Sequence, residues 1–576
     1  MNVPRAALSP RQRADALTAM REAGELDVLI VGGGVVGAGA ALDAVTRGLR
    51  TGIVEARDWA SGTSSRSSKL VHGGLRYLEM LDFGLVREAL AERGLLIQRI
   101  APHLVRPVPF LYPLTHRGWE RPYVGAGVLL YDTMGTALGN NRGLPRHRHL
   151  SRRRALREAP CLKPDSLVGA VQYWDAQVDD ARHTMTVVRT AAAFGALAAN
   201  RARVTGFLRE GERVTGARVV DLESGERFEV RAKQVINATG VWTDETQQLA
   251  DTRGQFHVRA SKGVHLVVPR DRLQSSTGLI LRTETSVLFV IPWGWHWIIG
   301  TTDTDWNLDL AHPAASARDI DYLLDRVNSV LTSPLSRADV EGVYAGLRPL
   351  LSGESELTSK LSREHVVAHP VPGLVVVAGG KYTTYRVMAR DAVDEAVRGL
   401  AGLTDGLVPE SVTEDIPLLG AEGWQGMRNQ RLQLAARSGL HVARIDHLLG
   451  RYGSLIGEVL QLIEADPTLA APIPGVDGYL LAEAAYAVSH EGARHLDDVL
   501  ARRTRASIEG WDRGVSAAPV VAELMAKELG WDAAHTATEV EHYLARVAAE
   551  RESQQQPDDA TADAARLGAP DIVPLH

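Results

Sequence analysis

The stretch from Leu26 to Gly37 constrains the fold of this chain more than any other. It reads Leu-Asp-Val-Leu-Ile-Val-Gly-Gly-Gly-Val-Val-Gly, an apolar run that ends in glycines and leads into small residues. Gly32, Gly34 and Gly37 have the G-x-G-x-x-G spacing, which indicates a buried strand, a tight turn and the start of a helix. Gly32 permits the turn, Gly34 permits close approach of a ligand, and Gly37 permits close packing of the helix on the strand. The N–H groups and the dipole of the helix then favour a pyrophosphate at its N-terminus.

A second stretch supports a nucleotide-binding unit. Thr51-Gly-Ile-Val-Glu55 is a short apolar run that ends in an acid about 20 residues after the turn, where such units bind ribose hydroxyls. The two stretches together predict a βαβ unit that binds a dinucleotide, and a chance glycine-rich turn is the alternative. Taken alone, the glycines would favour NAD as the dinucleotide.

Length and composition limit the class of protein. A chain of 576 residues is too long for one ordinary core, so roughly two to four domains are expected. The net charge of -6 is small for this length and argues against nucleic acid as a main partner. The single cysteine, Cys161, excludes an internal disulfide and indicates a reducing compartment, and no Cys or His cluster has the spacing of a metal site. We find neither a signal peptide nor a run of ~18 apolar residues, so we expect a cytoplasmic protein with peripheral membrane contact at most.

A polar segment follows the second strand. Ser61 to Ser68 is rich in hydroxyl groups, and Lys69, His72 and the pair Gly73-Gly74 come next. A solvated loop is the ordinary reading of such a segment. Because this one follows directly on a nucleotide-binding unit, we favour contacts with a pyrophosphate or with a flat ring, which the paired glycines would allow to lie against the backbone.

These motifs resemble those of a known flavoprotein family. The segments from Gly32 to Gly39, from Thr63 to Leu70 and from His72 to Glu79 are similar to the FAD-dependent glycerol-3-phosphate dehydrogenases, within the group that includes D-amino acid oxidase. The resemblance implies FAD as the cofactor and an α/β fold, with a Rossmann-type FAD-binding domain, an interleaved mixed-β substrate domain and a C-terminal all-α domain. The residues expected to bind the cofactor are Gly32, Gly34, Gly37, Glu55, Thr63, Ser64, Ser65, Ser68, Lys69, His72, Gly73, Gly240, Gly379 and Gly380.

The chain divides into four expected parts. Residues 1–25 form an N-terminal extension, in which Ser9 caps a helix that begins with Pro10. Helices are also expected over 83–100 and 184–199, and a hairpin of two apolar strands over 288–303, with Gly294 in its turn. The remaining parts are an FAD-binding domain over 26–410 with substrate segments at roughly 100–180 and 255–350, a helical domain without strands over 411–550, and a disordered tail over 551–576.

The resemblance also suggests a substrate site. Arg348 lies between apolar neighbours, so it should face a carboxylate or an anionic ligand. The family motifs place Arg348, Lys381 and Arg76 among the substrate contacts, with Tyr77 and Arg363 as additional ones. His265 is the candidate base, because an imidazole titrates near neutrality, and His72 is the alternative.

An arginine-rich segment follows an apolar one. Arg142, Arg146, Arg148, Arg152, Arg153, Arg154 and Arg157 come after a segment that contains Trp119, Tyr123 and Tyr131. A solvated basic loop and a patch that binds the membrane surface are both consistent with this pattern. The family is generally peripheral to the membrane, which favours attachment to the inner face of the cell membrane.

The implied reaction is the oxidation of sn-glycerol 3-phosphate to dihydroxyacetone phosphate, with hydride transfer from C2 to flavin N5. A membrane quinone is the expected electron acceptor, and a homodimer is the expected assembly. Three alternatives stay open: an oxidase that uses oxygen, an NAD-dependent dehydrogenase, and a flavin-stabilised binding protein without turnover. The NAD reading leaves the Ser/Thr loop and Gly379-Gly380-Lys381 unexplained.

Overall fold

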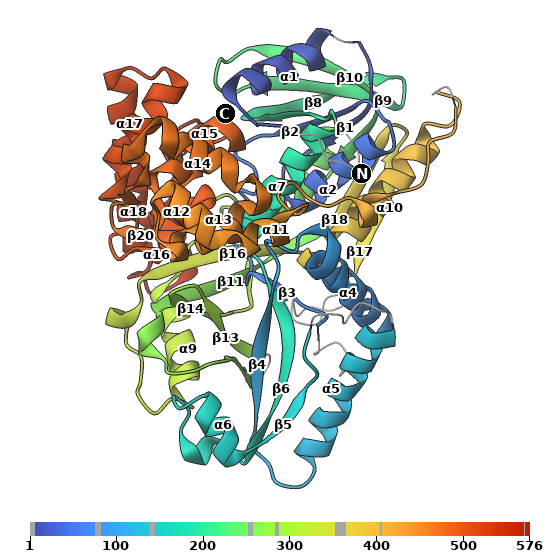
Figure 1. Ribbon diagram of the computed structural model, residues 1–576. Helices are drawn as coiled ribbons and strands as arrows, with labels where there is room; N and C mark the ends of the chain where they lie inside the picture. Colours follow the sequence, from blue (N-terminus) through green and yellow to red (C-terminus); the bar gives the residue numbers. More distant parts are fainter. Residues whose placement is uncertain are drawn as a thin grey trace.

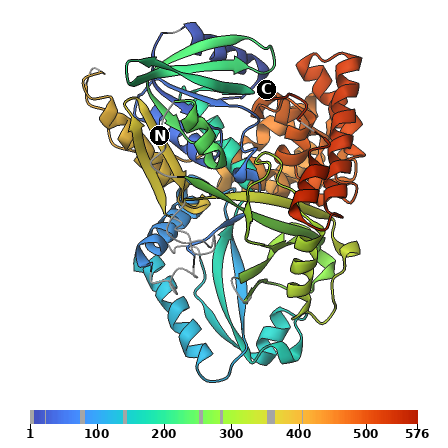
Figure 2. The same ribbon diagram turned by 180° about the vertical axis from the view of Figure 1, so that it is seen from behind.

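A computed structural model of the chain has two sheet-based parts and one helical part (Figure 1). It describes residues 6–22, 24–74, 82–137, 144–250, 257–282, 287–351, 364–403, 406–569 and 571–575. The first sheet and its helices lie at the top of Figure 1, the second sheet lies below, and the C-terminal helices lie along one side of both. Figure 2 shows the same helices from behind, next to the strands of the second sheet.

The first sheet is built around β1 (Leu26–Val31), which pairs in parallel with β2 (Thr51–Glu55) and β10 (Arg227–Asn237). Val28 and Ile30 point into a core shared with helices on one face, whereas Leu29 and Val31 point into a core on the other face, so the strand is buried on both sides. The order of the sheet is β17-β18-β10-β1-β2-β7, with β8 and β9 attached through β10. The other strands are β7 (Leu197–Asn200), β8 (Ala202–Glu210), β9 (Arg213–Asp221), β17 (His365–Val371) and β18 (Leu374–Gly379).

Three helices cover one face of this sheet. They are α2 (Val35–Thr46), α7 (Asp180–Ala193) and α10 (Tyr385–Gly399). The opposite face carries the β8–β9 meander and α1 (Pro10–Glu22). The expected cap of α1 is confirmed, because the Gln12 N–H donates to Ser9 Oγ at 3.1 Å.

The helix expected over 184–199 is wrong at both ends. The observed helix α7 begins earlier because the Asp179 side chain accepts from the Arg182 N–H and caps it. It ends before Gly195, which has a φ of +103°. The residues after this glycine form β7 and pair in parallel with β2. The first sheet therefore includes a segment that helical periodicity had predicted to be part of the helix.

The second sheet has the order β15-β11-β14-β13-β12-β4-β6-β3, with β16 beside β11 and β5 beside β6. Strand β11 pairs with both β16 and β14, which places His265 opposite Tyr344 of β16 and Gly300 of β14. The predicted hairpin is confirmed as β13 and β14, with Gly294 at a φ of +53° in the turn. The strands are β3 (Leu70–Val71), β4 (Arg106–Leu114), β5 (Arg148–Ser151), β6 (Gly169–Gln177), β11 (Val258–Pro269), β12 (Gly278–Arg282), β13 (Val287–Trp293), β14 (His296–Gly300), β15 (Thr304–Trp306) and β16 (Gly342–Leu351).

Helices flank this sheet on both sides. On one face α9 (Ala317–Asn328) and α6 (Arg152–Glu158) close a core. On the other face α4 (Phe83–Leu95) and α5 (Glu120–Ala137) close another. The helix expected over 83–100 is therefore present, although its last turn widens into a π-helical segment over Leu96–Ile100.

The C-terminal part is mostly helical. Its two cores are formed by α13 (Val442–Tyr452), α14 (Ile456–Ala465), α15 (Leu481–Glu491), α17 (Ala517–Leu529) and α18 (Ala533–Ser553). The expectation that strands are absent here is wrong, because Pro472–Ile473 and Val476–Leu480 form a short hairpin, β19–β20.

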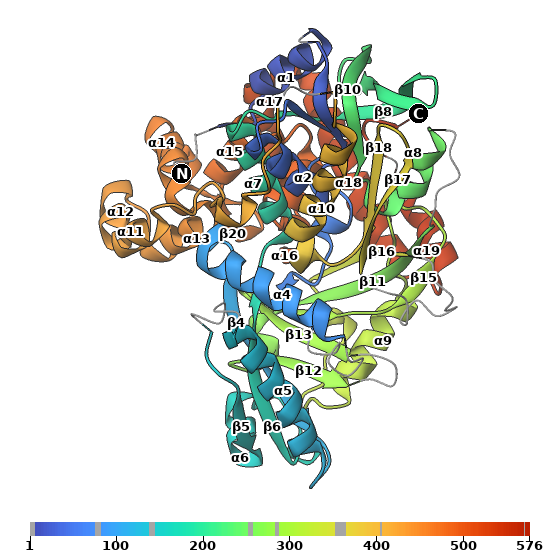
Figure 3. The ribbon, with the colours of Figure 1, turned by 90° about the vertical axis from the view of Figure 1, so that its right-hand side faces the viewer.

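The described part of the tail, residues 551–569 and 571–575, is ordered, which corrects the expectation of disorder over 551–576. Helix α19 (Asp559–Arg566) lies beside β11, β15 and β16 (Figure 3), and Ala562 is fully buried in a core with Trp306. Lys262 Nζ of β11 donates to Asp559 at 2.5 Å and to Asp319 at 2.7 Å. The polar composition of the tail therefore reflects ion pairs with the body of the protein rather than solvation of a free chain.

We predict that Ala562→Asp releases the tail, whereas Ala564→Asp does not. Ala562 is buried and Ala564 is exposed on the same helix, so only the first substitution places a carboxylate in an apolar core, at a cost of several kcal/mol. Limited trypsin digestion should cleave after Arg551 or Arg566 at least tenfold faster in Ala562→Asp. Equal cleavage of the two variants would contradict the docking of α19.

Candidate functional site

The glycine turn after β1 leaves no room for side chains. Gly32 has a φ of +112°, and a Cβ there would lie 2.6 Å from the Ala238 carbonyl oxygen of the loop after β10. A Cβ on Gly37 would lie 1.9 Å from the Gly32 carbonyl oxygen. The turn therefore packs α2 directly against two strand ends, as the spacing of the glycines predicts.

The turn opens into a cavity of about 510 Å³. Most of its walls come from the β1–α2 turn, the loop after β2, the end of β10, and the turn between β18 and α10, and shorter stretches at 202–204, 309–311, Pro349 and Leu575 complete them. Nine of the predicted residues line it: Gly32, Gly34, Glu55, Thr63, Ser64, Gly240, Gly379, Gly380 and Lys381. Because these segments are far apart in the chain, their meeting supports one long ligand rather than several small ones.

The cavity has the chemistry that FAD requires. Helix α2 points its N-terminus at it and has no side-chain cap of its own, but the Val35 N–H donates to Ser64 Oγ at 2.9 Å. Arg57, Arg203 and Lys381 add positive charge to the lining. A helix N-terminus with nearby cations suits a pyrophosphate, and the glycine walls suit a flat ring.

Glu55 occupies the end of β2, as expected for an acid that binds ribose. Its two carboxylate oxygens accept from the Gly33 N–H at 2.6 Å and from the Arg57 N–H at 2.7 Å. Burial raises the pKa of Glu55. The carboxylate thus ties the glycine turn to the loop after β2 while it lines the cavity.

The other predicted cofactor residues lie behind the cavity wall. Lys69 is fully buried, and its Nζ donates to Asp180 at 2.8 Å and to the Ser65 carbonyl oxygen at 3.2 Å. A Cβ on Gly73 would meet the side chains of Leu90 and Tyr131, so this glycine serves packing. The structure also places Gly37, Ser65, Ser68 and His72 outside the lining of the cavity.

Asp180 organises the loop that contains Ser67 and Lys69, although no sequence motif predicted a role for it. Besides Lys69, its buried carboxylate accepts from the Ser67 N–H at 2.9 Å, from Ser67 Oγ at 2.7 Å and from Arg505 at 2.6 Å. The available signal was the pair Asp179-Asp180 at the start of α7, two acids that a helix N-terminus alone does not require.

His265 lies at the junction of the two sheets. Its Nε2 is 2.8 Å from Ser68 Oγ, and its ring stacks on Tyr344 with the ring centroids 4.7 Å apart. A Cβ on Gly300 would lie 2.3 Å from its ring, so the neighbouring strand makes space for it. Burial, together with the positive charges of Arg348 and Lys69, lowers the pKa of His265 well below its usual value. Burial and these two cations therefore favour the neutral imidazole.

Arg348 lies on β16, which pairs with the strand of His265, β11. Its guanidinium is 3.4 Å from Asp303 and donates to the Thr302 carbonyl oxygen at 3.2 Å and to Thr301 Oγ1 at 3.2 Å. The expectation that it faces a carboxylate or an anionic ligand is consistent with the contact to Asp303. Arg76, Tyr77 and Arg363, the other expected substrate contacts, lie outside the described residues.

Known proteins resemble this chain over most of its length. The family model described as FAD dependent oxidoreductase matches residues 27–386, and the model described as C-terminal domain of alpha-glycerophosphate oxidase matches residues 411–536. The chain is 60% identical to glycerol-3-phosphate dehydrogenase 2 of Mycobacterium tuberculosis, over 99% of this chain and 96% of that protein. It is 38% identical to the human mitochondrial glycerol-3-phosphate dehydrogenase, over 91% of this chain and 73% of that protein.

A solved structure is similar over nearly the whole chain. The glycerol-3-phosphate dehydrogenase from Bacillus halodurans, determined in complex with FAD, superposes with a TM-score of 0.75 at 29% identity. The match covers 94% of this chain and 98% of that one.

We predict that Gly37→Ala abolishes flavin retention, whereas Gly457→Ala does not. A methyl group at position 37 would force α2 away from the Gly32 carbonyl, but at position 457 of α14 it would meet no atom within 4 Å. The control should be neutral or more stable by about 0.5–1 kcal/mol, because alanine favours a helix. Flavin absorbance per protein and the melting temperature measure both effects, and a normal flavin content in Gly37→Ala would contradict the assigned role of the turn.

Proposed function

This chain belongs to the FAD-dependent glycerol-3-phosphate dehydrogenase family, and we propose how its own residues carry out the reaction. The enzyme oxidises glycerol 3-phosphate with FAD as the cofactor. The observation that carries the proposal is the meeting of the FAD cavity, a buried neutral histidine and an arginine at the junction of the two sheets: Pro349 lines the cavity, and Arg348 directly precedes it.

Arg348 and Lys381 are proposed to bind the substrate phosphate. Lys381 lines the cavity in the turn after β18, whereas Arg348 lies on β16 of the other sheet, next to the lining residue Pro349. A dianion held between them would be fixed relative to the cofactor ring, and guanidinium groups bind phosphate oxygens through two parallel hydrogen bonds. By resemblance, Arg76, Tyr77 and Arg363 would complete this subsite.

His265 is proposed to remove the proton of the C2 hydroxyl. If Ser68 Oγ accepts the Nε2–H, Nδ1 carries the lone pair, and Nδ1 has no hydrogen-bond partner among the described residues. Stacking on Tyr344 fixes the orientation of the ring. When bound, FAD supplies the hydride acceptor for the C2 hydrogen. The nearby charge of Arg348 favours the alkoxide-like character that develops as the proton leaves.

Anaerobic stopped-flow reduction of the flavin by sn-glycerol 3-phosphate tests both roles. We predict that Arg348→Ala weakens substrate binding by at least 100-fold, and that His265→Asn slows reduction at saturating substrate by ~10²- to 10⁴-fold, the usual contribution of a general base. Arg337→Ala, which removes an exposed arginine paired with Asp321, should behave like the wild type. Normal reduction by either site variant would remove that residue from the mechanism.

We also propose that the enzyme docks on a membrane and passes its electrons to a quinone. One end of the substrate domain carries α5, β5 and α6 together (Figure 1). Trp119, next to α5, is 56% exposed, and Tyr123 of α5 is 51% exposed. The exposed arginines of the neighbouring segment are Arg146, Arg148, Arg152, Arg153, Arg154 and Arg157.

Aromatic and basic side chains on one end of the protein suit an interfacial anchor. Each arginine near anionic lipid contributes about 1 kcal/mol. The described helices include none that is long and apolar enough to cross a bilayer, so docking at the surface is the form of attachment that we propose.

Vesicles of anionic lipid that contain menaquinone test the docking and the acceptor together. We predict that Trp119→Ser with Tyr123→Ser lowers quinone reduction at least tenfold and leaves the reduction of a water-soluble dye unchanged. Trp511→Ser, which removes another exposed tryptophan in the C-terminal part, is the control. Rapid peroxide formation in air, with no reduction of quinone, would instead identify oxygen as the acceptor.

A further inference from the structure

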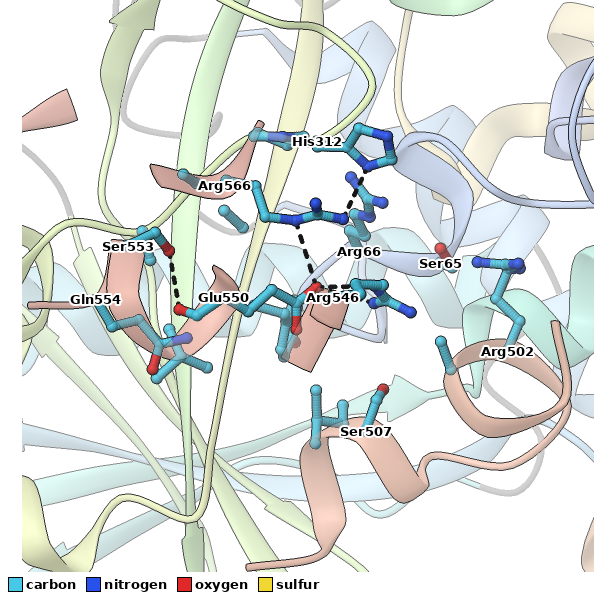
Figure 4. A pocket seen from close by; sticks show the side chains of 18 of the residues that line it. Ser65, Arg66, His312, Arg502, Ser507, Arg546, Glu550, Ser553, Gln554 and Arg566 are labelled. Atoms are coloured by element: carbon cyan, nitrogen blue, oxygen red, sulfur yellow. Dashed lines mark hydrogen bonds and ion pairs between the residues drawn. The ribbon is translucent and has the colours of Figure 1, made fainter. Parts of the chain in front are cut away.

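A second, smaller cavity lies behind the loop of residues 61–68, here called the flavin loop. It has a volume of about 80 Å³ and is enclosed by the 61–68 loop, β16 and the C-terminal helices α16 (Ala506–Glu509), α18 and α19. Figure 4 shows Arg546 and Arg566 joined to Glu550, with Arg66 beside them and Arg502 across the cavity. The basic and acidic side chains of the lining are those of five arginines, one histidine and one glutamate: Arg66, Arg502, Arg505, Arg546, Arg566, His312 and Glu550.

The arginines of this pocket differ in how their charge is balanced. Arg502 pairs with Asp58, Asp497 and Asp498, and Arg505 pairs with Asp179 and Asp180. These carboxylates compensate two of the arginines.

The other three arginines share fewer acids. Arg546 and Arg566 both pair with Glu550, and Arg546 also reaches Asp497. Arg66 donates one hydrogen bond, to the Ala311 carbonyl oxygen at 3.0 Å, and forms no ion pair with the residues that the structure describes. The guanidinium of Arg66 therefore faces the cavity with most of its donors unused.

The electrostatics of the pocket show the same excess of positive charge. Burial, together with the charges of Arg546 and Arg502, lowers the pKa of Arg66 to about 9. Although burial opposes it, the charges of Arg546 and Arg566 lower the pKa of Glu550 to about 2. An added anion would relieve the repulsion among these arginines.

We propose that this pocket binds a small phosphate-type dianion, separately from the substrate site. The volume corresponds to several water molecules, enough for a tetrahedral oxyanion or for the phosphate end of a small ester. Arginine guanidinium groups bind such oxyanions through charge-assisted hydrogen bonds, and Ser507 adds a hydroxyl to the lining.

Occupancy of the pocket would act on the flavin loop through Arg66. Two residues before it, Ser64 accepts from the N-terminus of α2, and two residues after it, Ser68 contacts His265. The Arg66 carbonyl also lies directly against β16, where a Cβ on Gly346 would approach it to 2.3 Å. An anion that fixes Arg66 therefore stabilises a loop that serves both the cofactor and the proposed base.

Equilibrium dialysis of the FAD-loaded enzyme with labelled inorganic phosphate, at constant ionic strength, tests the proposal. The wild type and Arg337→Ala should bind two phosphates, Arg66→Gln and Arg348→Ala one each, and the double variant none. If Arg66→Gln loses its flavin, Arg66→Lys gives the same test, with second-site binding at least threefold weaker. Two phosphates bound by Arg66→Gln, or a single phosphate on the wild type that disappears in Arg348→Ala, would overturn the proposal.

Competition with glycerol 3-phosphate then distinguishes the sources of the anion. Displacement of one phosphate identifies a pocket for the free ion, and displacement of both identifies a pocket that also accepts phosphate esters. The Arg348→Ala arm keeps this test separate from the proposed substrate site, because the phosphate that this variant retains is the one assigned to Arg66.

Discussion

The buried carboxylate of Asp180 connects the functional parts of the molecule. It binds Ser67 through two hydrogen bonds, pairs with Lys69 from the same loop, and pairs with Arg505 from the C-terminal helices. Removal of one partner from such a buried cluster leaves an uncompensated charge and typically costs about 3–5 kcal/mol. The position of the loop thus depends on α7, which begins with Asp180, and on Arg505, which directly precedes α16. The same contacts fix the position of Ser68, which contacts His265.

Local sequence signals predict much of the fold. The glycine turn, the β13–β14 hairpin and the strand–turn–helix around Gly379 depend on residues close together in the chain, where periodicity and glycine conformation decide the outcome. The segment after α7 shows the limit of such signals, because a strand of the first sheet recruits residues that also fit a helix. The tail shows the same limit of local signals. Its acids and arginines suggest a solvated chain, but in the structure they form ion pairs with Lys262 and Glu550.

The sequence predicts which types of residue form the site better than it predicts which of them contact one another. Gly32 and Gly380, where a Cβ would clash with neighbouring atoms, line the cavity as their motifs imply. Lys69 belongs to a motif of the same family but is turned away from the cavity, because an acid more than a hundred residues later neutralises it. Arg66 shows the opposite case, since no described acid pairs with it. Pairings across such distances are decided by topology, which local patterns do not encode.

The walls of the flavin cavity come from within residues 31–67, 202–204, 238–249, 309–311, 349 and 377–388, and Leu575 adds a contact from the tail. A growing chain that has not yet released the last of these from the ribosome has no complete site, so the cofactor can be captured only late in synthesis. Until then β10 lacks its neighbour β18, and an unpaired strand edge makes a folding intermediate prone to aggregate. Supply of flavin during expression should therefore determine the soluble yield of this chain as well as its activity.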